Sequence, residues 1–278
     1  MTIMDEPCYR INKYYRHMKS LDSIAEDFYH AFYKKEWLGD TSSMNNLTIA
    51  EAYEVQDLVA KKRIEKGEYV VGYKVGCTSN AIQDQFGIDD PINGRLFQPH
   101  ILDSKATIDY SNYVNCAIEP EMVFKIGKNL KGVGLSDEEL INSIAYVSPG
   151  IELHNFKFWV EPPTIQELIC SGGIHAGLIV GEQKVDPRKL LFKDELFSVY
   201  KDGNLVTSAL SSEIMGGPIH SLRWLVTFLT KKEKTLKKDS LVIPGSPVEL
   251  VNIDQDTELK VVIDKVGSLT TRMEKLEI

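Results

Sequence analysis

Residues 118–126 constrain the fold most strongly, because they read as a strand that carries two carboxylates one residue apart. Side chains alternate across a strand, so Glu119 and Glu121 share one face, while Ile118, Met122 and Phe124 make the other face apolar enough for a core. Like charges on a half-buried strand repel each other unless a positive charge lies between them. The pattern therefore indicates either a divalent cation bound by carboxylate oxygens or a solvent-facing strand with two surface glutamates.

Helical patterns come early in the chain, and strand patterns dominate later. The apolar spacing of residues 21–37 predicts a helix. Three capping boxes, in which a Ser or Thr precedes a Glu by three residues, predict the starts of three more helices, and we expect the second of these to reach about residue 145. The boxes are Thr48–Glu51, Ser136–Glu139 and Thr164–Glu167.

Strands are predicted over residues 70–76, 176–181, 241–243, 259–263 and 269–273. Helices before strands favour an α+β fold over a regular alternation of strand and helix. We therefore expect a helical N-terminal region over residues 1–69 and a strand-rich core over residues 70–278, integrated into one domain.

Composition excludes several classes of protein. The 278 residues include 43% hydrophobic and 26% charged residues, as in globular proteins, and the net charge of −8 argues against a nucleic-acid partner. An apolar run approaching the roughly 20 residues of a membrane helix is missing, and so is an apolar signal segment near the start, so we expect a cytoplasmic protein without a membrane partner. The four cysteines lack C-x-x-C spacing, which argues against zinc.

Six motifs, in order, resemble those of a known family. Residues 72–79 read Gly-Tyr-Lys-Val-Gly-Cys-Thr-Ser and continue through Gln83, Gly87 and the Gly-Arg-Leu-Phe of residues 94–97. The others are the two-carboxylate strand and residues 149–153, 176–181, 216–225 and 241–246. Together they resemble the 2-keto-4-pentenoate hydratase and 4-oxalocrotonate decarboxylase family of the fumarylacetoacetate hydrolase superfamily, from about residue 48 to residue 273.

The resemblance implies a mixed β-roll of the fumarylacetoacetate hydrolase type and a homo-oligomer. It also implies that Glu119, Glu121 and Glu152 hold Mg²⁺ or Mn²⁺, and that Lys74 faces the same cavity. Lys74, Glu119 and Glu121 are then the expected catalytic residues. The expected substrate-binding residues are Lys74, Thr78, Gln83, Arg95, Lys157 and Ser246.

The implied chemistry is that of a small 2-oxo or 2-hydroxydienoate acid, which chelates a hard divalent ion that stabilises the enolate. Lys74 either offsets carboxylate charge or, with a depressed pKa, shuttles a proton; a structural ion pair is the alternative. The expected reaction is hydration of a 2-hydroxy-2,4-dienoate to a 4-hydroxy-2-oxo acid. Three alternatives stay open: decarboxylation of a 2-oxo-3-enedioate, hydrolysis of an acylpyruvate, and a catalytically weak subunit that partners an active relative.

Several positions depart from the family pattern. Ile92 stands where an Asp usually partners the lysine, and Asp89 or Asp90 replaces it only if the loop shifts. Lys157 stands in place of an Arg, and Pro244 in place of a Thr. Residues 170–175 replace a segment rich in Ala, Asp and Asn.

Two histidines fall near the implied site. His154 and His175 are candidates to supply acid/base chemistry, with structural histidines as the alternative. Arg95, Lys157 and Arg223 are candidate contacts for a second carboxylate on the substrate.

Overall fold

The computed structural model describes residues 19–36, 47–156, 159 and 162–276 of the chain. Its helices are α1 (Leu21–Lys34), α2 (Ile49–Glu65), α3 (Asn80–Phe86), α4 (Asp137–Ile141), α5 (Ile165–Cys170) and α6 (Pro218–Lys231). Its strands are β1 (Tyr69–Gly76), β2 (Ile92–Gln98), β3 (Ile101–Asp103), β4 (Ile108–Asp109), β5 (Cys116–Ile126), β6 (Ile144–Asn155), β7 (His175–Val180), β8 (Leu196–Lys201), β9 (Asn204–Leu210), β10 (Leu241–Ile243), β11 (Val251–Asn252), β12 (Thr257–Ile263) and β13 (Gly267–Glu274).

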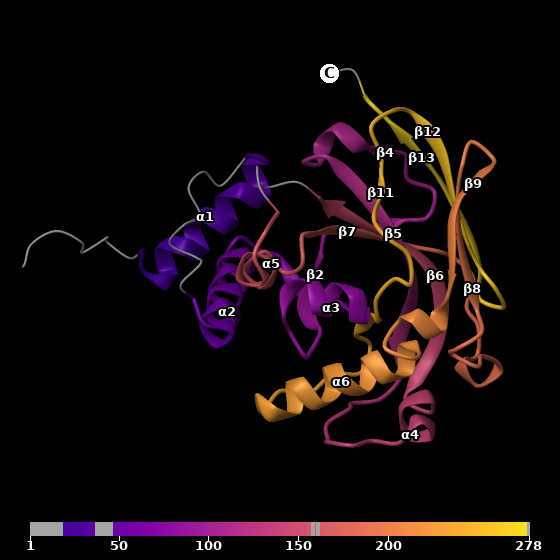
Figure 1. Ribbon diagram of the computed structural model, residues 1–278, viewed down its shortest axis with the longest axis horizontal. Helices are drawn as coiled ribbons and strands as arrows, with labels where there is room; N and C mark the ends of the chain where they lie inside the picture. Colours follow the sequence, from indigo (N-terminus) through magenta and orange to yellow (C-terminus); the bar gives the residue numbers. More distant parts are fainter. Residues whose placement is uncertain (1–18, 37–46, 157–158, 160–161, 277–278) are drawn as a thin grey trace, which may run out of the picture.

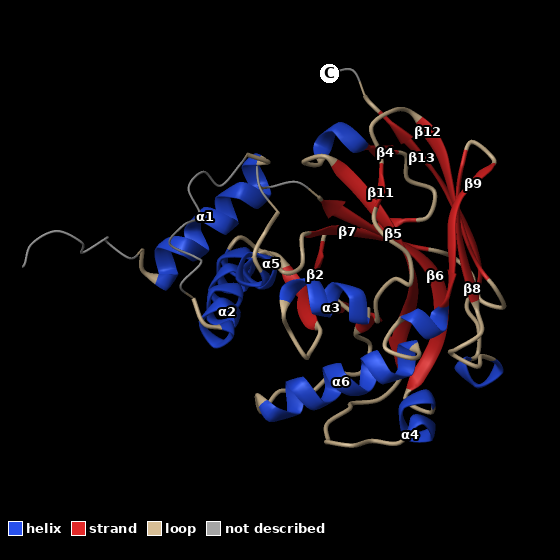
Figure 2. Cartoon of the chain, viewed as in Figure 1, coloured by secondary structure: helices blue, strands red, loops and turns tan. Residues whose placement is uncertain are grey.

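Two sheets form the body of the molecule (Figure 2). The larger sheet has the order β2-β1-β10-β5-β6-β7-β3, with β11 paired to β5, and the smaller has the order β4-β13-β12-β8-β9. The main apolar cluster joins the two sheets and α6, and it contains Ile118, Met122 and Phe124 of β5 together with Phe197 of β8. The predicted apolar face of β5 is therefore confirmed, and its opposite face carries the glutamates.

A glycine allows β1 to pair in parallel with β10. Gly72 lies opposite Leu241 in this pairing, and a Cβ at position 72 would lie 1.9 Å from the carbonyl oxygen of Leu241. The glycine therefore permits the close backbone approach that connects β1, and with it Lys74, to the centre of the larger sheet.

The three predicted capping boxes are confirmed at the starts of α2, α4 and α5. The helix after Ser136 is shorter than predicted: α4 ends at Ile141, and β6 begins at Ile144, which pairs with Ile126 of β5. Pairing with the long central strand overrides the local helical pattern here, because it places Ile144 in the main apolar cluster.

The N-terminal helices pack against the sheet edge rather than standing apart (Figure 1). α1 contacts α2, and α2 contacts α5, which comes from the β6–β7 connection. A second apolar cluster unites these helices with Ile92 of β2. The described helices α1 and α2 therefore share a core with the strand-rich part, and the boundary near residue 69 stays a prediction.

A buried ion pair fastens these helices. Arg63 Nε of α2 lies 2.7 Å from Glu68 Oε2, and its guanidinium lies between the rings of Phe32 and Phe97, 4.2 Å and 3.9 Å from their centres. Tyr33 also donates a hydrogen bond to Glu68 Oε1 at 2.5 Å. The Glu68 carboxylate therefore joins α1 to α2, and the Arg63 guanidinium extends the contact to Phe97 of β2.

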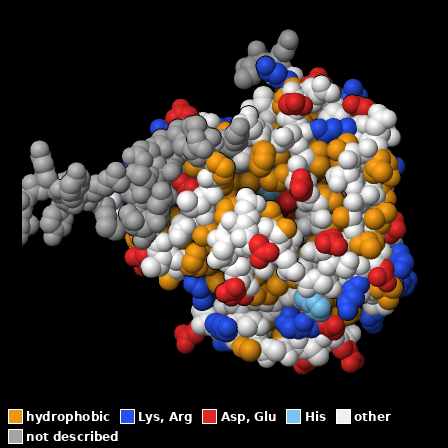
Figure 3. All heavy atoms as spheres, viewed as in Figure 1, with side chains coloured by type: hydrophobic (Ala, Val, Ile, Leu, Met, Phe, Trp, Pro, Cys, Tyr) orange, Lys and Arg blue, Asp and Glu red, His pale blue; other side chains and the backbone are white. Residues whose placement is uncertain are grey.

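On the face shown in Figure 3, acidic and basic side chains are interspersed rather than gathered into a patch of one sign. Within the residues that the structure describes, none of the helices is both long and apolar enough to cross a membrane.

Candidate metal centre and active site

The pairing of β5 with β6 creates the acidic centre. Glu119 lies opposite Glu152 in the antiparallel register, and Ala117 lies opposite His154. Alternation places Glu119 and Glu121 on one face of β5, and Glu152 and His154 on the same face of β6. Glu121 and Glu152 are fully buried, whereas the Glu119 side chain keeps 22% of its surface exposed.

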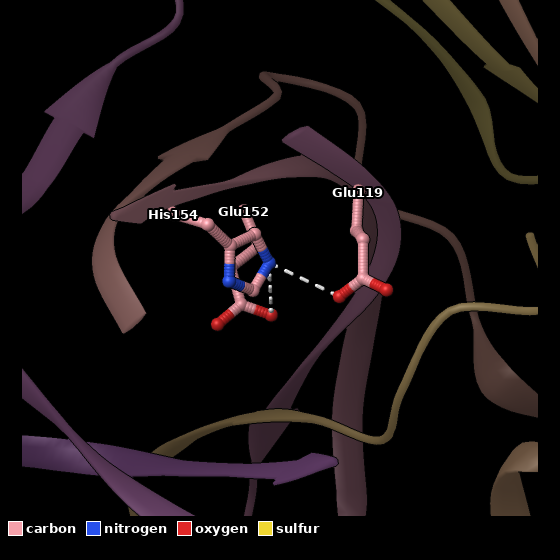
Figure 4. Close-up of side chains that lie close together, drawn as sticks. All are labelled: Glu119, Glu152 and His154. Carbon is pink, nitrogen blue, oxygen red and sulfur yellow. Dashed lines mark hydrogen bonds and ion pairs between the residues drawn. The ribbon is translucent and has the colours of Figure 1, made fainter. Parts of the chain in front are cut away.

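His154 adds an imidazole to the glutamates of this centre (Figure 4). Its Nε2 lies 3.0 Å from Glu119 Oε2 and 3.5 Å from Glu152 Oε2, and Figure 4 shows the ring pointing between the two carboxylates. One ligand atom from each of Glu119, Glu152 and His154 lies within 4.8 Å of the others. The three side chains can therefore converge on one ion.

Lys74 of β1 lies against Glu152, as the family resemblance implies. Its Nζ is 2.8 Å from Glu152 Oε1 and donates a hydrogen bond to the carbonyl oxygen of Gly173 at 2.9 Å. Burial alone would lower the pKa of Lys74, but the negative charges of Glu152 and Glu119 raise it above its usual value. This direction favours a charge-offsetting role for Lys74 over a proton shuttle with a depressed pKa.

The surroundings shift the pKa values of the two buried carboxyl groups, those of Glu121 and Glu152, in opposite directions. Burial and the neighbouring Glu152 and Glu119 charges raise the pKa of Glu121 well above its usual value. Burial also acts against ionisation of Glu152, but Lys74, His154 and His175 overcome it and lower its pKa. Like charges so close cannot all ionise without added positive charge, which is the environment that a divalent ion relieves.

His175 of β7 contacts the same oxygen of Glu152 as Lys74 does. Its Nδ1 is 2.7 Å from Glu152 Oε1, and burial lowers the pKa of the ring to about 4. His175 is thus a neutral, buried side chain in contact with the centre.

Unsatisfied oxygens indicate that the centre fits a cation. Glu121 Oε1 and Glu152 Oε2 are buried and have no hydrogen-bond partner within the part of the chain that the structure describes. Buried carboxylate oxygens are costly when unpaired, and oxygen atoms of this kind are the ligands that divalent ions prefer. The donor set therefore fits a hard divalent ion, although the structure contains none.

The β10–β11 connection closes one side of the centre. The Gly245 amide donates a hydrogen bond to Glu121 Oε2 at 3.2 Å. Gly245 has φ +115°, and a Cβ there would lie 2.7 Å from the side chain of buried Thr78. The neighbouring Ser246 hydroxyl bonds within its own turn, to Val248. Thr78 and Ser246 therefore lie beside the glycine whose amide bonds to Glu121, and their role as substrate contacts stays a prediction.

The structure gives partners to three of the other predicted contacts. Gln83 donates a hydrogen bond to the carbonyl oxygen of Cys77. Arg95 lies opposite Tyr73 in the β1–β2 register, on the other sheet face from Lys74, and pairs with Asp57. Arg223 pairs with Asp137, and Lys157 lies outside the described residues.

The structure explains how Lys74 is paired although Ile92 stands where the family usually has an Asp partner. Ile92 is buried in the helical cluster, and Asp90 accepts a hydrogen bond from the Trp224 indole, so Glu152 is the carboxylate that pairs with Lys74. The sequence located His154 and His175 near the site, but it did not place them among the metal ligands. The signal for His154 was its alternation with Glu152 on the same strand.

A surface hollow of about 790 Å³ lies elsewhere. Its lining comes from β1, β10, Lys125 and residues 233–241, and it includes none of the acidic side chains described above.

Comparisons with known proteins show which sequences this chain resembles. The chain is 27% identical to 4-oxalocrotonate decarboxylase of a Pseudomonas species over 224 residues, which cover 81% of this chain and 86% of the relative. It is 24% identical to 2-keto-4-pentenoate hydratase of Paraburkholderia xenovorans over 229 residues, 82% of this chain and 85% of the relative. None of the protein-family models matches the chain. These relatives confirm the resemblance predicted from the motifs.

Solved structures agree on the fold. The crystal structure of 4-oxalocrotonate decarboxylase from Pseudomonas putida G7, complexed with magnesium and adipate, superposes with a TM-score of 0.86 at 22% identity. The match covers 91% of this chain and 97% of that chain. The predicted α+β fold of the fumarylacetoacetate hydrolase type is therefore confirmed.

Proposed function

We propose that this chain, which resembles the 2-keto-4-pentenoate hydratase and 4-oxalocrotonate decarboxylase family over most of its length, is a divalent-metal-dependent lyase. Its proposed reaction is hydration of a small 2-hydroxy-2,4-dienoate, as its 2-oxo-3-enoate tautomer, to a 4-hydroxy-2-oxo acid. Such a step belongs to the catabolism of aromatic compounds by meta-cleavage. The observation that carries the proposal is the buried glutamate centre with unpaired oxygens beside Lys74.

In this proposal Glu119, Glu121 and Glu152 hold Mg²⁺ or Mn²⁺. When bound, the ion supplies the positive charge that stabilises the enolate of a 2-oxo acid. Lys74 keeps Glu152 ionised and presents a second positive charge to the substrate carboxylate, because its own pKa is raised. Lys74, Glu119 and Glu121 are the proposed catalytic residues.

The binding of the substrate is assigned to the rim of the centre. Thr78 and Ser246 flank Gly245, whose amide bonds to Glu121, and so they are placed to hold the substrate close to the glutamates. Gln83, Arg95 and Lys157 stay predictions, since the first two have other partners and the third lies outside the described residues.

The side chains around the centre favour a monocarboxylate over a dicarboxylate substrate. Arg95 and Arg223, two of the three candidate contacts for a second carboxylate, are paired with Asp57 and Asp137. We therefore rank the hydratase first and the 2-oxo-3-enedioate decarboxylase second. A homo-oligomeric, cytoplasmic enzyme with Mg²⁺ or Mn²⁺ as its ion is part of the same proposal.

The test is a turnover assay followed by ultraviolet absorbance, with products identified by mass. The 2-hydroxydienoate monoacid and its dicarboxylate homologue are each offered with Mg²⁺ or Mn²⁺. Gain of water by the monoacid supports the hydratase, and loss of CO₂ from the dicarboxylate supports the decarboxylase. Consumption of neither substrate, with an ion bound, contradicts both and favours a partner subunit.

A variant connects the reaction to the centre. Replacing Glu121 by Gln keeps the acceptor for the Gly245 amide but removes a carboxylate, so we expect loss of ion binding and of turnover. Unchanged turnover in Glu121→Gln contradicts the assignment.

A further inference from the structure

The imidazole of His154 lies where a metal ligand would lie, and none of the predicted ligand sets includes it. Its Nε2 is 3.0 Å from Glu119 Oε2 and 3.5 Å from Glu152 Oε2. Two ligand atoms in adjacent positions, each about 2.1 Å from one ion, are about 3.0 Å apart in octahedral geometry and about 3.4 Å apart in tetrahedral geometry. The 3.0 Å distance, which is a hydrogen bond in this structure, equals an octahedral edge, and the 3.5 Å distance is close to a tetrahedral one.

The position of His154 in the fold makes this arrangement rigid. Residue 154 is two residues after Glu152 on β6, so both side chains leave the strand on the same face, and the His154 side chain is only 2% exposed. A buried strand residue has little freedom to turn away from the centre. Figure 4 shows the ring pointing between Glu119 and Glu152.

A second observation points to a cation bound at this place. Glu152 Oε2, the oxygen nearest to His154, is completely buried and has no hydrogen-bond partner among the described residues. An oxygen in this state is costly unless a cation binds it. Its neighbour Oε1 is already used by Lys74 and His175, so Oε2 is the oxygen available to an ion.

We propose that His154 Nε2 is a metal ligand, so that the site combines glutamate oxygens with one imidazole and selects Mn²⁺, Co²⁺ or Zn²⁺ over Mg²⁺. Imidazole suits the transition metals, whereas Mg²⁺ prefers carboxylate, carbonyl and water oxygens. With Glu119, Glu152 and His154 as ligands, an octahedral ion keeps positions for the two oxygens of a 2-oxo acid. This inference rests on the metal centre of the proposed function and specifies which ion it takes.

The test measures the ligands directly and not through activity. The full-length protein is loaded with Mn²⁺, and pulsed electron paramagnetic resonance records the modulation from directly bound ¹⁴N. Wild type and His175→Val should show this modulation, and His154→Val should lose it. Equal spectra in wild type and His154→Val, or loss only in His175→Val, overturn the proposal.

Affinities provide the second readout. We expect His154→Val to lower Mn²⁺ affinity by at least about tenfold and to change Mg²⁺ affinity by less than about threefold. His30→Val, which removes an exposed histidine of α1, is the matched control and should change neither. A parallel loss for both ions in His154→Val contradicts the proposed selectivity.

A variant that does not fold still leaves the proposal testable in the wild type. Anomalous diffraction from Mn²⁺ in wild-type crystals should place the ion about 2.0–2.3 Å from His154 Nε2. An ion bound only by oxygens, together with intact turnover, overturns this inference and leaves the proposed function standing. Failure to bind any of these ions overturns both.

Discussion

Lys74 provides the sharpest test of the electrostatics of the centre. Lys74→Met keeps the length of the side chain but removes the charge that lies 2.8 Å from Glu152 and the donor to the carbonyl oxygen of Gly173. The side chain is 4% exposed, and its partner is completely buried. Removing one member of a buried ion pair costs about 3–5 kcal/mol, because the other charge is left uncompensated.

The expected cost depends on the metal. In chelator-treated protein, Lys74→Met should lower the free energy of unfolding by about 3–5 kcal/mol and Tm by roughly 10 °C. With Mn²⁺ at saturation the loss should fall below about 2 kcal/mol, since the ion supplies positive charge to the same carboxylates. Urea and thermal unfolding, with and without the ion, measure both quantities.

The matched control is Lys125→Met on β5. Lys125 donates a hydrogen bond to the carbonyl oxygen of Asp239 and has no buried carboxylate partner among the described contacts. Replacing Lys125 should lower the free energy of unfolding by less than about 1 kcal/mol, with or without Mn²⁺. A loss below about 1 kcal/mol for Lys74→Met, or an equal loss in both conditions, would refute the reasoning.

Three further predictions concern Glu121, Gly245 and Glu68. Because the pKa of Glu121 is raised, Mn²⁺ binding should release a proton from this carboxyl group, which calorimetry in buffers of different ionisation enthalpy detects. Glu121→Gln should release fewer protons on binding Mn²⁺, and equal release contradicts this. Gly245→Ala should lower the free energy of unfolding by at least about 2 kcal/mol and weaken ion binding, since φ is +115° and a Cβ would lie 2.7 Å from Thr78. A urea unfolding curve close to that of wild type would disprove it. Burial opposes ionisation of Glu68, but His100, Tyr33 and Arg63 lower its pKa to about 2. The ionised carboxylate therefore stabilises the fold fully above about pH 4.5, and this stabilisation is lost as the pH falls towards 2. Glu68→Gln should flatten the dependence of the free energy of unfolding on pH across that window, and an unchanged slope argues against it.

Local sequence signals predicted most of the elements. The capping boxes at Thr48, Ser136 and Thr164 start helices because each hydroxyl accepts a backbone N–H that the helix leaves free. Alternation likewise predicted the two faces of β5. The end of α4 could not be predicted in this way, because it is set by the pairing of Ile144 with Ile126, a contact between distant segments.

The motifs indicated which residues belong to the candidate centre, but not which of them contact one another. The motifs located Lys74, Glu119, Glu121 and Glu152, whereas the β5–β6 register that places Glu119 opposite Glu152 requires the folded sheet. For the same reason the sequence could not reveal that Arg95 is neutralised by Asp57, 38 residues away. Nor could it identify Glu152 as the partner of Lys74 once the usual Asp was replaced by Ile92.

The central claim is that a divalent ion in the glutamate centre enables turnover of a 2-oxo acid. The most direct measurement is a titration of chelator-treated protein with Mn²⁺, following bound ion and turnover of the 2-hydroxydienoate in the same samples. The account predicts no turnover without the ion, a rise in proportion to the bound ion up to one per chain, and no such rise in Glu152→Gln. Full turnover in the presence of chelator, with no ion bound, would contradict it.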